Sequence, residues 1–164
     1  MPLLVKLDNK RLWDKPSWLP AGEVPAEAVQ DFRLDENQLS VWYIEPSQSN
    51  LDRVLTALAA NRDHVEKIDY AIFEDEVVGK CGITLRQTAG QSPDEYASRE
   101  WHRDLIELSG RKLVSLAESI GASGPAQRKP LAVVRDLLAA AARDGHIRKE
   151  MMKDTLAGKL QWPE

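Results

Sequence analysis

Cysteine is nearly absent from the sequence, and histidine is sparse. Cys81 is the one cysteine, which excludes an internal disulfide and any CxxC metal or redox site. The three histidines, His64, His102 and His146, share no ligand spacing such as HxxxH or HExxH. We therefore predict no cofactor and no metal site. The nearest metal candidates would be Glu74 and Glu76, because carboxylates just past a strand end can hold a hard cation.

Long apolar runs and phosphate-binding loops are missing as well. Nothing approaches 18 consecutive apolar residues, and the apolar run within MPLLVKLDNKRLW is too short for a signal peptide. The segment GKCG at 79–82 lacks the span and the Ser/Thr of a Walker loop, and no GxSxG elbow occurs. These absences predict a cytoplasmic protein without a membrane partner. They also favour a binding protein over an enzyme.

Negative charge is in excess, but it is unevenly spread. The net charge is −4. Residues 1–82 hold nine Lys/Arg against 15 Asp/Glu, whereas residues 83–164 hold 13 against 11. Phosphate binding needs a concentrated basic face, so this balance disfavours nucleic acid as the main partner. A protein with a basic surface is the more natural partner for the acidic half.

Short runs rich in β-branched and aromatic residues predict strands in the N-terminal half. The candidates are QLSVWYIE, IDYAIF and ITLRQT, with LLVKL near the N-terminus as a further short one. Helical spacing of apolar residues predicts a helix from Leu51 to about Lys67, and shorter helices are expected over 25–32 and before Gly82. We therefore expect a small sheet of about three short strands packed with helices.

The second half of the sequence is predicted to be helical. Ser92, Pro93 and Glu95 have the spacing of a capping box, which predicts a helix running toward Ile120 with a kink or break at Gly110. After a flexible connector, a helix over 130–143 and another from His146 predict an αα-hairpin. The expected fold is thus α+β with a helical C-terminal half. We divide it into a mixed α+β domain, 1–122, and a helical hairpin appendage, 123–164, docked on the same domain.

His102 is the weak candidate for a catalytic residue. On the predicted helix it lies about 60° from Leu105, at the flank of the apolar face, while Asp104 points elsewhere. A histidine on an apolar face is more often a packed residue than a catalyst. The structural interpretation is therefore favoured, although a carboxylate distant in sequence could still meet His102 in the fold.

The leading functional hypothesis is a non-enzymatic protein that binds a macromolecular partner, as an immunity protein, an antitoxin or a regulatory subunit does. Trp13 and Trp18, in a proline-rich segment, and the acidic cluster Glu74, Asp75 and Glu76 are the predicted contacts. One alternative is a metal-dependent hydrolase or nuclease that uses the acidic cluster and a histidine. A second is a nucleic-acid-binding regulator that uses the basic hairpin, whose cations are Arg128, Lys129, Arg135, Arg143, Arg148, Lys149, Lys153 and Lys159.

Overall fold

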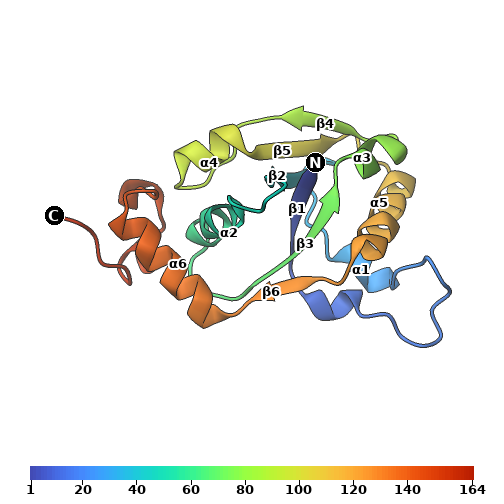
Figure 1. Ribbon diagram of the computed structural model, residues 1–164, viewed down its shortest axis with the longest axis horizontal. Coiled ribbons are helices and arrows are strands. Elements are labelled where there is room, and N and C mark those ends of the chain that lie inside the picture. Colours follow the sequence, from blue (N-terminus) through green and yellow to red (C-terminus); the bar gives the residue numbers. More distant parts are fainter.

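A six-stranded antiparallel sheet runs through the computed structural model, which describes all 164 residues (Figure 1). The strand order is β4-β5-β2-β1-β3-β6. The strands are β1 (Pro2–Leu7), β2 (Leu39–Tyr43), β3 (Ile68–Glu74), β4 (Thr84–Gln87), β5 (His102–Ile106) and β6 (Gln127–Lys129).

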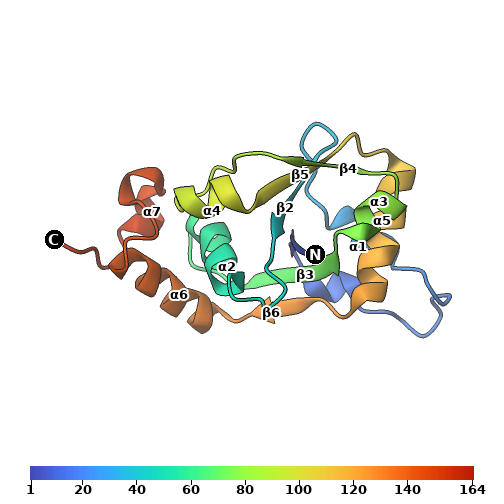
Figure 2. The same ribbon diagram turned by 45° about the horizontal axis from the view of Figure 1, so that its top comes forward.

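Helices cover both faces of this sheet (Figure 2). One face carries α2 (Leu51–Ala60), α4 (Glu95–Glu100), α6 (Leu131–Arg143) and α7 (Asp154–Ala157), with the 3-10 turn η2 (Lys149–Met151) before α7. The other face carries the 3-10 turn η1 (Lys10–Trp13), α1 (Ala26–Gln30), α3 (Glu76–Lys80) and α5 (Gly110–Ser123). None of the helices has both the length and the apolar character needed to cross a bilayer.

The position of each strand follows from its pattern of apolar residues. In β1, Leu3 and Val5 enter one core and Leu4 enters the other, and each is at most 1% exposed. A strand that is apolar on both faces belongs in the middle of a covered sheet. By contrast, all four residues of β4 are exposed, and β6 reads Gln-Arg-Lys. Polar, charged edge strands of this kind protect a sheet against pairing with other chains.

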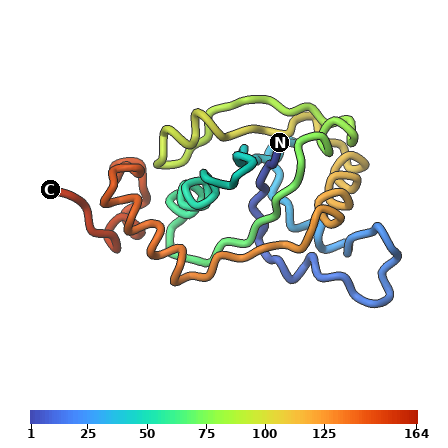
Figure 3. Tube along the Cα trace, viewed as in Figure 1, coloured from blue at the N-terminus to red at the C-terminus, as the bar shows by residue number.

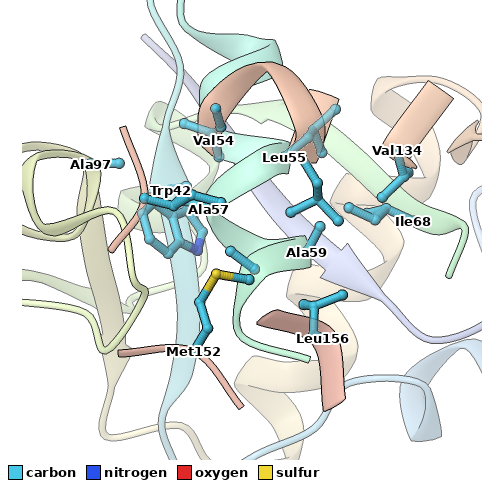
Figure 4. Packing of buried hydrophobic residues seen from close by; sticks show 14 of the residues in the cluster. Trp42, Val54, Leu55, Ala57, Ala59, Ile68, Ala97, Val134, Met152 and Leu156 are labelled. Carbon is cyan, nitrogen blue, oxygen red and sulfur yellow. The ribbon is translucent and has the colours of Figure 1, made fainter. Parts of the chain in front are cut away.

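The core beneath α2 joins segments far apart in the sequence. Trp42 of β2 and Leu55 of α2 pack with Val134 of α6 and with Met152 and Leu156 near the C-terminus (Figure 4). Each of these five buried side chains contributes about 1.5–3 kcal/mol of transfer free energy. The C-terminal residues are therefore held against the same sheet face as α2.

The expectation of about three short strands is wrong, because the sheet has six. The prediction missed β5 and β6. Strand β5 lies inside the segment that was predicted as one helix from Ser92 to Ile120, and β6 lies in the predicted connector. Ser109 caps α5 by accepting a hydrogen bond from the backbone N–H of Lys112, so two helices with a strand between them replace the single helix.

The expectation of a helical C-terminal half ending in an αα-hairpin is also wrong. After α6, only the three residues of η2 and the four of α7 are helical. Met152 and Lys153 between them are extended, with ψ of 153° and 137°. Extended backbone at these positions lets Met152 and Leu156 both enter the core. At the other end of the segment, β6 pairs with β3 in the sheet.

Candidate functional site

His102 lies on β5, and this changes which residues it can meet. Side chains two apart on a strand share a face, so His102 and Asp104 point the same way. Thr88, just after β4, lies between them: its Oγ1 is 2.9 Å from Nδ1 of His102 and donates to Oδ2 of Asp104 at 2.8 Å. Ser40 of β2 donates to the other oxygen, Oδ1, at 3.1 Å. The prediction of a helix here, on which Asp104 points away from His102, is therefore wrong.

The hydrogen bonds around His102 determine which ring nitrogen carries the proton. Because Thr88 Oγ1 donates to Asp104, it must accept from the imidazole, and the Thr88 carbonyl oxygen also lies 3.3 Å from Nδ1. The proton therefore resides on Nδ1. Nε2 keeps its lone pair, lies 3.9 Å from Oδ1 of Asp104 and has no hydrogen-bond partner. Since no buried side-chain nitrogen or oxygen lacks a partner, Nε2 must reach the surface.

The His102 ring is held on two sides. Its side chain is 9% exposed and packs edge-on against Trp42, with the ring centroids 5.1 Å apart. On another side the backbone of Gly90 approaches so closely that a Cβ there would lie 3.0 Å from the ring. Burial lowers the pKa of His102 below its ordinary value of 6.5, against the opposing influence of Asp104. The ring is therefore neutral at pH 7.

His102 lines a cavity of about 410 Å³ between β2, β5, the end of α2 and the segment 89–92. Its lining is rich in hydrogen-bond acceptors and holds three carboxylates against one guanidinium. The polar lining residues are Arg33, Asp35, Glu36, Gln38, Ser40, Asn61, Gln91, Ser92, His102 and Asp104. We call this space the His102 cavity. It suits a small ligand that donates hydrogen bonds.

The second prominent feature is a loop that projects beside α1 and the end of α5 (Figure 3). We call residues 14–24 the Trp18 loop. It consists of two consecutive turns, in which the N–H of Leu19 donates to the carbonyl of Pro16 and that of Glu23 to the carbonyl of Pro20. Trp18 occupies the third position of the first turn and is 74% exposed, the largest exposure among the chain's large apolar side chains.

Both ends of the Trp18 loop lie against Gly121 of α5. A Cβ at Gly121 would lie 2.6 Å from Cγ1 of Val24 and 3.9 Å from Cε of Lys15. The loop thus leaves and rejoins the body at one place, as an Ω-loop does. A cavity of about 440 Å³ lies at its base, lined by Trp13, Asp14, Ile120 and neighbouring residues.

The two predicted tryptophan contacts differ in environment. Trp13 is 8% exposed, stacks edge-on against Phe32 and donates from Nε1 to Asp31 at 3.0 Å. Trp13 also lines the cavity at the base of the Trp18 loop. Trp18, by contrast, is free on the surface.

The acidic cluster Glu74–Glu76 lies around the start of α3. Glu74 and Asp75 both pair with the Met1 amine, at 3.1 and 2.7 Å, and Glu76 pairs with Lys80. No three metal-ligating side chains of the protein come together. Strands β2 and β1 separate His102 from β3, a distance of about 14 Å at the usual strand spacing. The structure therefore does not unite His102 with Glu74 and Glu76.

Most basic residues of the C-terminal segment form ion pairs within the protein. Five of the eight pair with carboxylates, three of them with Asp52, Asp63 and Asp69 of the acidic half. The three without an ion pair are Arg135, Lys149 and Lys159. This pairing leaves little concentrated positive charge on the segment for a phosphate backbone.

No protein-family model, curated protein or solved structure matches this chain. Thr88 and Ser40 were not among the predicted site residues, and they meet Asp104 only through strand pairing. No local pattern in residues 102–106 indicated these contacts, because only His102 and Leu105 of β5 are buried and they point to opposite faces of the sheet.

Proposed function

We propose that this protein acts by binding another protein through the Trp18 loop, without catalysis, in the manner of an immunity protein, an antitoxin or a regulatory subunit. The observation that carries this proposal is the 74% exposure of Trp18 on a loop whose two ends are anchored. Tryptophan is strongly enriched among the few residues that supply most of the free energy of protein–protein binding.

The loop is suited to this role because its conformation is largely formed before binding. Pro16 and Pro20 restrict the backbone, and each begins a hydrogen-bonded turn. Gly22, with φ of +84°, supplies the left-handed residue that the second turn needs. A preorganised loop loses less conformational entropy on association, so more of the contact energy of Trp18 contributes to affinity.

The charges around the loop indicate the chemistry of the partner. Within residues 14–27, Asp14, Glu23 and Glu27 are exposed against the one cation Lys15, while Lys10 lines the cavity at the base of the loop. We expect a partner with an apolar pocket for the indole and a basic rim around it. We expect the cavity at the base of the loop to receive a side chain from that partner in return.

The test compares proteins captured from the native cell lysate by the wild type, Trp18→Ala and Met151→Ala. Met151 is 43% exposed in η2, at the far end of the molecule from the loop, and provides the matched control. We expect a partner retained by wild type and Met151→Ala, with affinity lowered about 30-fold or more by Trp18→Ala, as for a binding hot spot.

Folding must be checked in the same variants. Because Trp18 buries little surface, its replacement should change the free energy of unfolding by less than about 0.5 kcal/mol. A partner that binds Trp18→Ala as tightly as the wild type would refute the proposed role of the loop. Loss of binding together with loss of folding would show that Trp18 is structural instead.

A further inference from the structure

The His102 cavity is one end of a longer groove. At the other end lies a cavity of about 720 Å³, whose charged lining holds five cations against three carboxylates. These residues are Lys6, Arg33, Arg62, Lys67, Lys153, Asp8, Asp63 and Glu66. We call it the cationic cavity. Counting lysines, arginines and carboxylates, its lining has a net charge of +2, whereas that of the His102 cavity has a net charge of −2.

A smaller cavity of about 130 Å³ shares lining residues with both of these cavities. It shares Lys6 and Asp8 with the cationic cavity, and Ser40, Trp42 and Leu58 with the His102 cavity. Arg33 lines all three spaces. We call the whole the Arg33 groove. Each end falls within the size range of small-molecule sites, about 300–1,000 Å³.

We infer that the Arg33 groove binds a small phosphorylated polyol, that is, a phosphate monoester on a hydroxyl-bearing ring such as a sugar phosphate or a nucleoside monophosphate. The phosphate lies in the cationic cavity. Four of its five cations already pair with Asp8, Asp63 or Glu66, so the charge open to the phosphate is the net +2 of the lining and Lys67, which makes no ion pair within the protein. The hydroxyls donate to Nε2 of His102 and to the carboxylate of Asp104 in the His102 cavity.

The geometry at His102 favours a donor over any other ligand group there. Thr88 holds the Nδ1–H, so Nε2 offers only a lone pair to the cavity. A hydroxyl of the ligand fits this lone pair, while an anionic group would be repelled by Asp35, Glu36 and Asp104. A phosphate is instead attracted to the other end. The opposite charges of the two ends therefore orient the ligand along the groove.

The three histidines provide a direct assay. His64 lines the cationic cavity, His102 lines the other end, and His146 lines neither. We would titrate the protein with ribose 5-phosphate, adenosine 5′-monophosphate, inorganic phosphate and ribose, and follow the imidazole resonances by NMR. Ribose 5-phosphate should shift His64 and His102 saturably and leave His146 unchanged. Inorganic phosphate alone should shift only His64.

Variants separate the two ends. Lys67→Gln should weaken ribose 5-phosphate and inorganic phosphate alike, by about two- to fivefold for one screened charge. His102→Gln should weaken only ribose 5-phosphate, by about two- to tenfold for one hydrogen bond. Since His102 is buried, Gln91→Ala offers a second, exposed change at the same end. Lys149→Gln, an unpaired lysine outside the groove, is the matched control and should change nothing.

The outcomes separate the possible explanations. Tighter binding of the adenosine nucleotide than of ribose 5-phosphate would assign the groove to nucleotides, and equal binding would assign it to sugar phosphates. If ribose 5-phosphate shifts only His64, or shifts all three histidines equally, the inference is wrong. No shift with any of the four probes would also overturn it.

Discussion

A methyl group added at Gly90 should disturb His102 without removing any of its hydrogen-bonding groups. A Cβ at this position would lie 3.0 Å from Cδ2 and Cγ of His102 and 3.3 Å from its Cβ. Ordinary van der Waals contact begins at about 3.4 Å, so the ring and the backbone must separate by about 0.4 Å. Trp42 packs against the ring and restricts its retreat.

The expected cost follows from two opposing effects. Overpacking a filled site costs about 1–3 kcal/mol. Replacing glycine by alanine at a permissive backbone position stabilises by about 0.4–1 kcal/mol through the unfolded chain. For Gly90→Ala the first effect is larger, and we expect a net loss of about 1–2 kcal/mol. In a chain of this length, each kcal/mol lowers Tm by about 2–4 °C.

The matched control is Gly79→Ala in α3, where a Cβ would meet nothing within 4 Å. This variant should raise the free energy of unfolding by up to about 1 kcal/mol. Urea unfolding gives the stabilities, and the imidazole ¹⁵N shifts of His102 report the Nδ1–Thr88 hydrogen bond. If Gly90→Ala is as stable as Gly79→Ala and leaves the His102 shifts unchanged, the ring is not held as we describe.

Three further outcomes are expected. In Arg128→Gln, the buried Asp69 loses its two guanidinium bonds of 2.6 and 2.9 Å and keeps the Lys10 N–H, so urea unfolding should show a loss of about 2–4 kcal/mol. Burial lowers the pKa of His102, so the unfolded chain binds more protons between the two pKa values. This contribution to stability is complete above pH 6.5 and is lost as the pH falls through the folded-state pKa. The Tm difference between pH 7.5 and pH 5 should therefore shrink in His102→Gln. Finally, Trp13→Phe removes the Nε1 donor to Asp31 and should cost about 1–3 kcal/mol by urea unfolding.

The sequence predicted elements whose apolar pattern extends over the whole element. The strands β1 to β4 and the helices α1, α3 and α6 occur where alternation, helical spacing or punctuation indicated them. Helix α2 begins as expected but ends at Ala60, not near Lys67. The residues that follow its end, from Asn61 to Lys67, contribute to the cationic cavity.

The sequence did not predict β5, because the apolar residues of this segment do not alternate as they do in a typical half-buried strand. Only His102 and Leu105 of its five residues are buried, and they point to opposite faces of the sheet. That spacing also fits one flank of a helix, and the apparent capping box before it strengthened the helical interpretation. In the structure, Asp94 caps the short helix α4 by accepting from the N–H of Ala97, and Ser92 instead donates to the carbonyl of Ala57.

Buried carboxylates determine where the two candidate sites lie, and their partners are distant in sequence. Asp31 accepts from Asn9 N–H and from Trp13, which fixes the segment that leads into the Trp18 loop. Asp94 binds Arg53 of α2 through two hydrogen bonds, which fixes the chain just after the Gly90 side of the His102 cavity. Local patterns carry no information about such pairs, because each joins residues 18 or more positions apart. Each pairing is nevertheless required, since a buried carboxylate without partners would cost several kcal/mol. Trp13 and Trp18 are similar in sequence context, and what separates their roles is that Asp31 is within reach of only one of them.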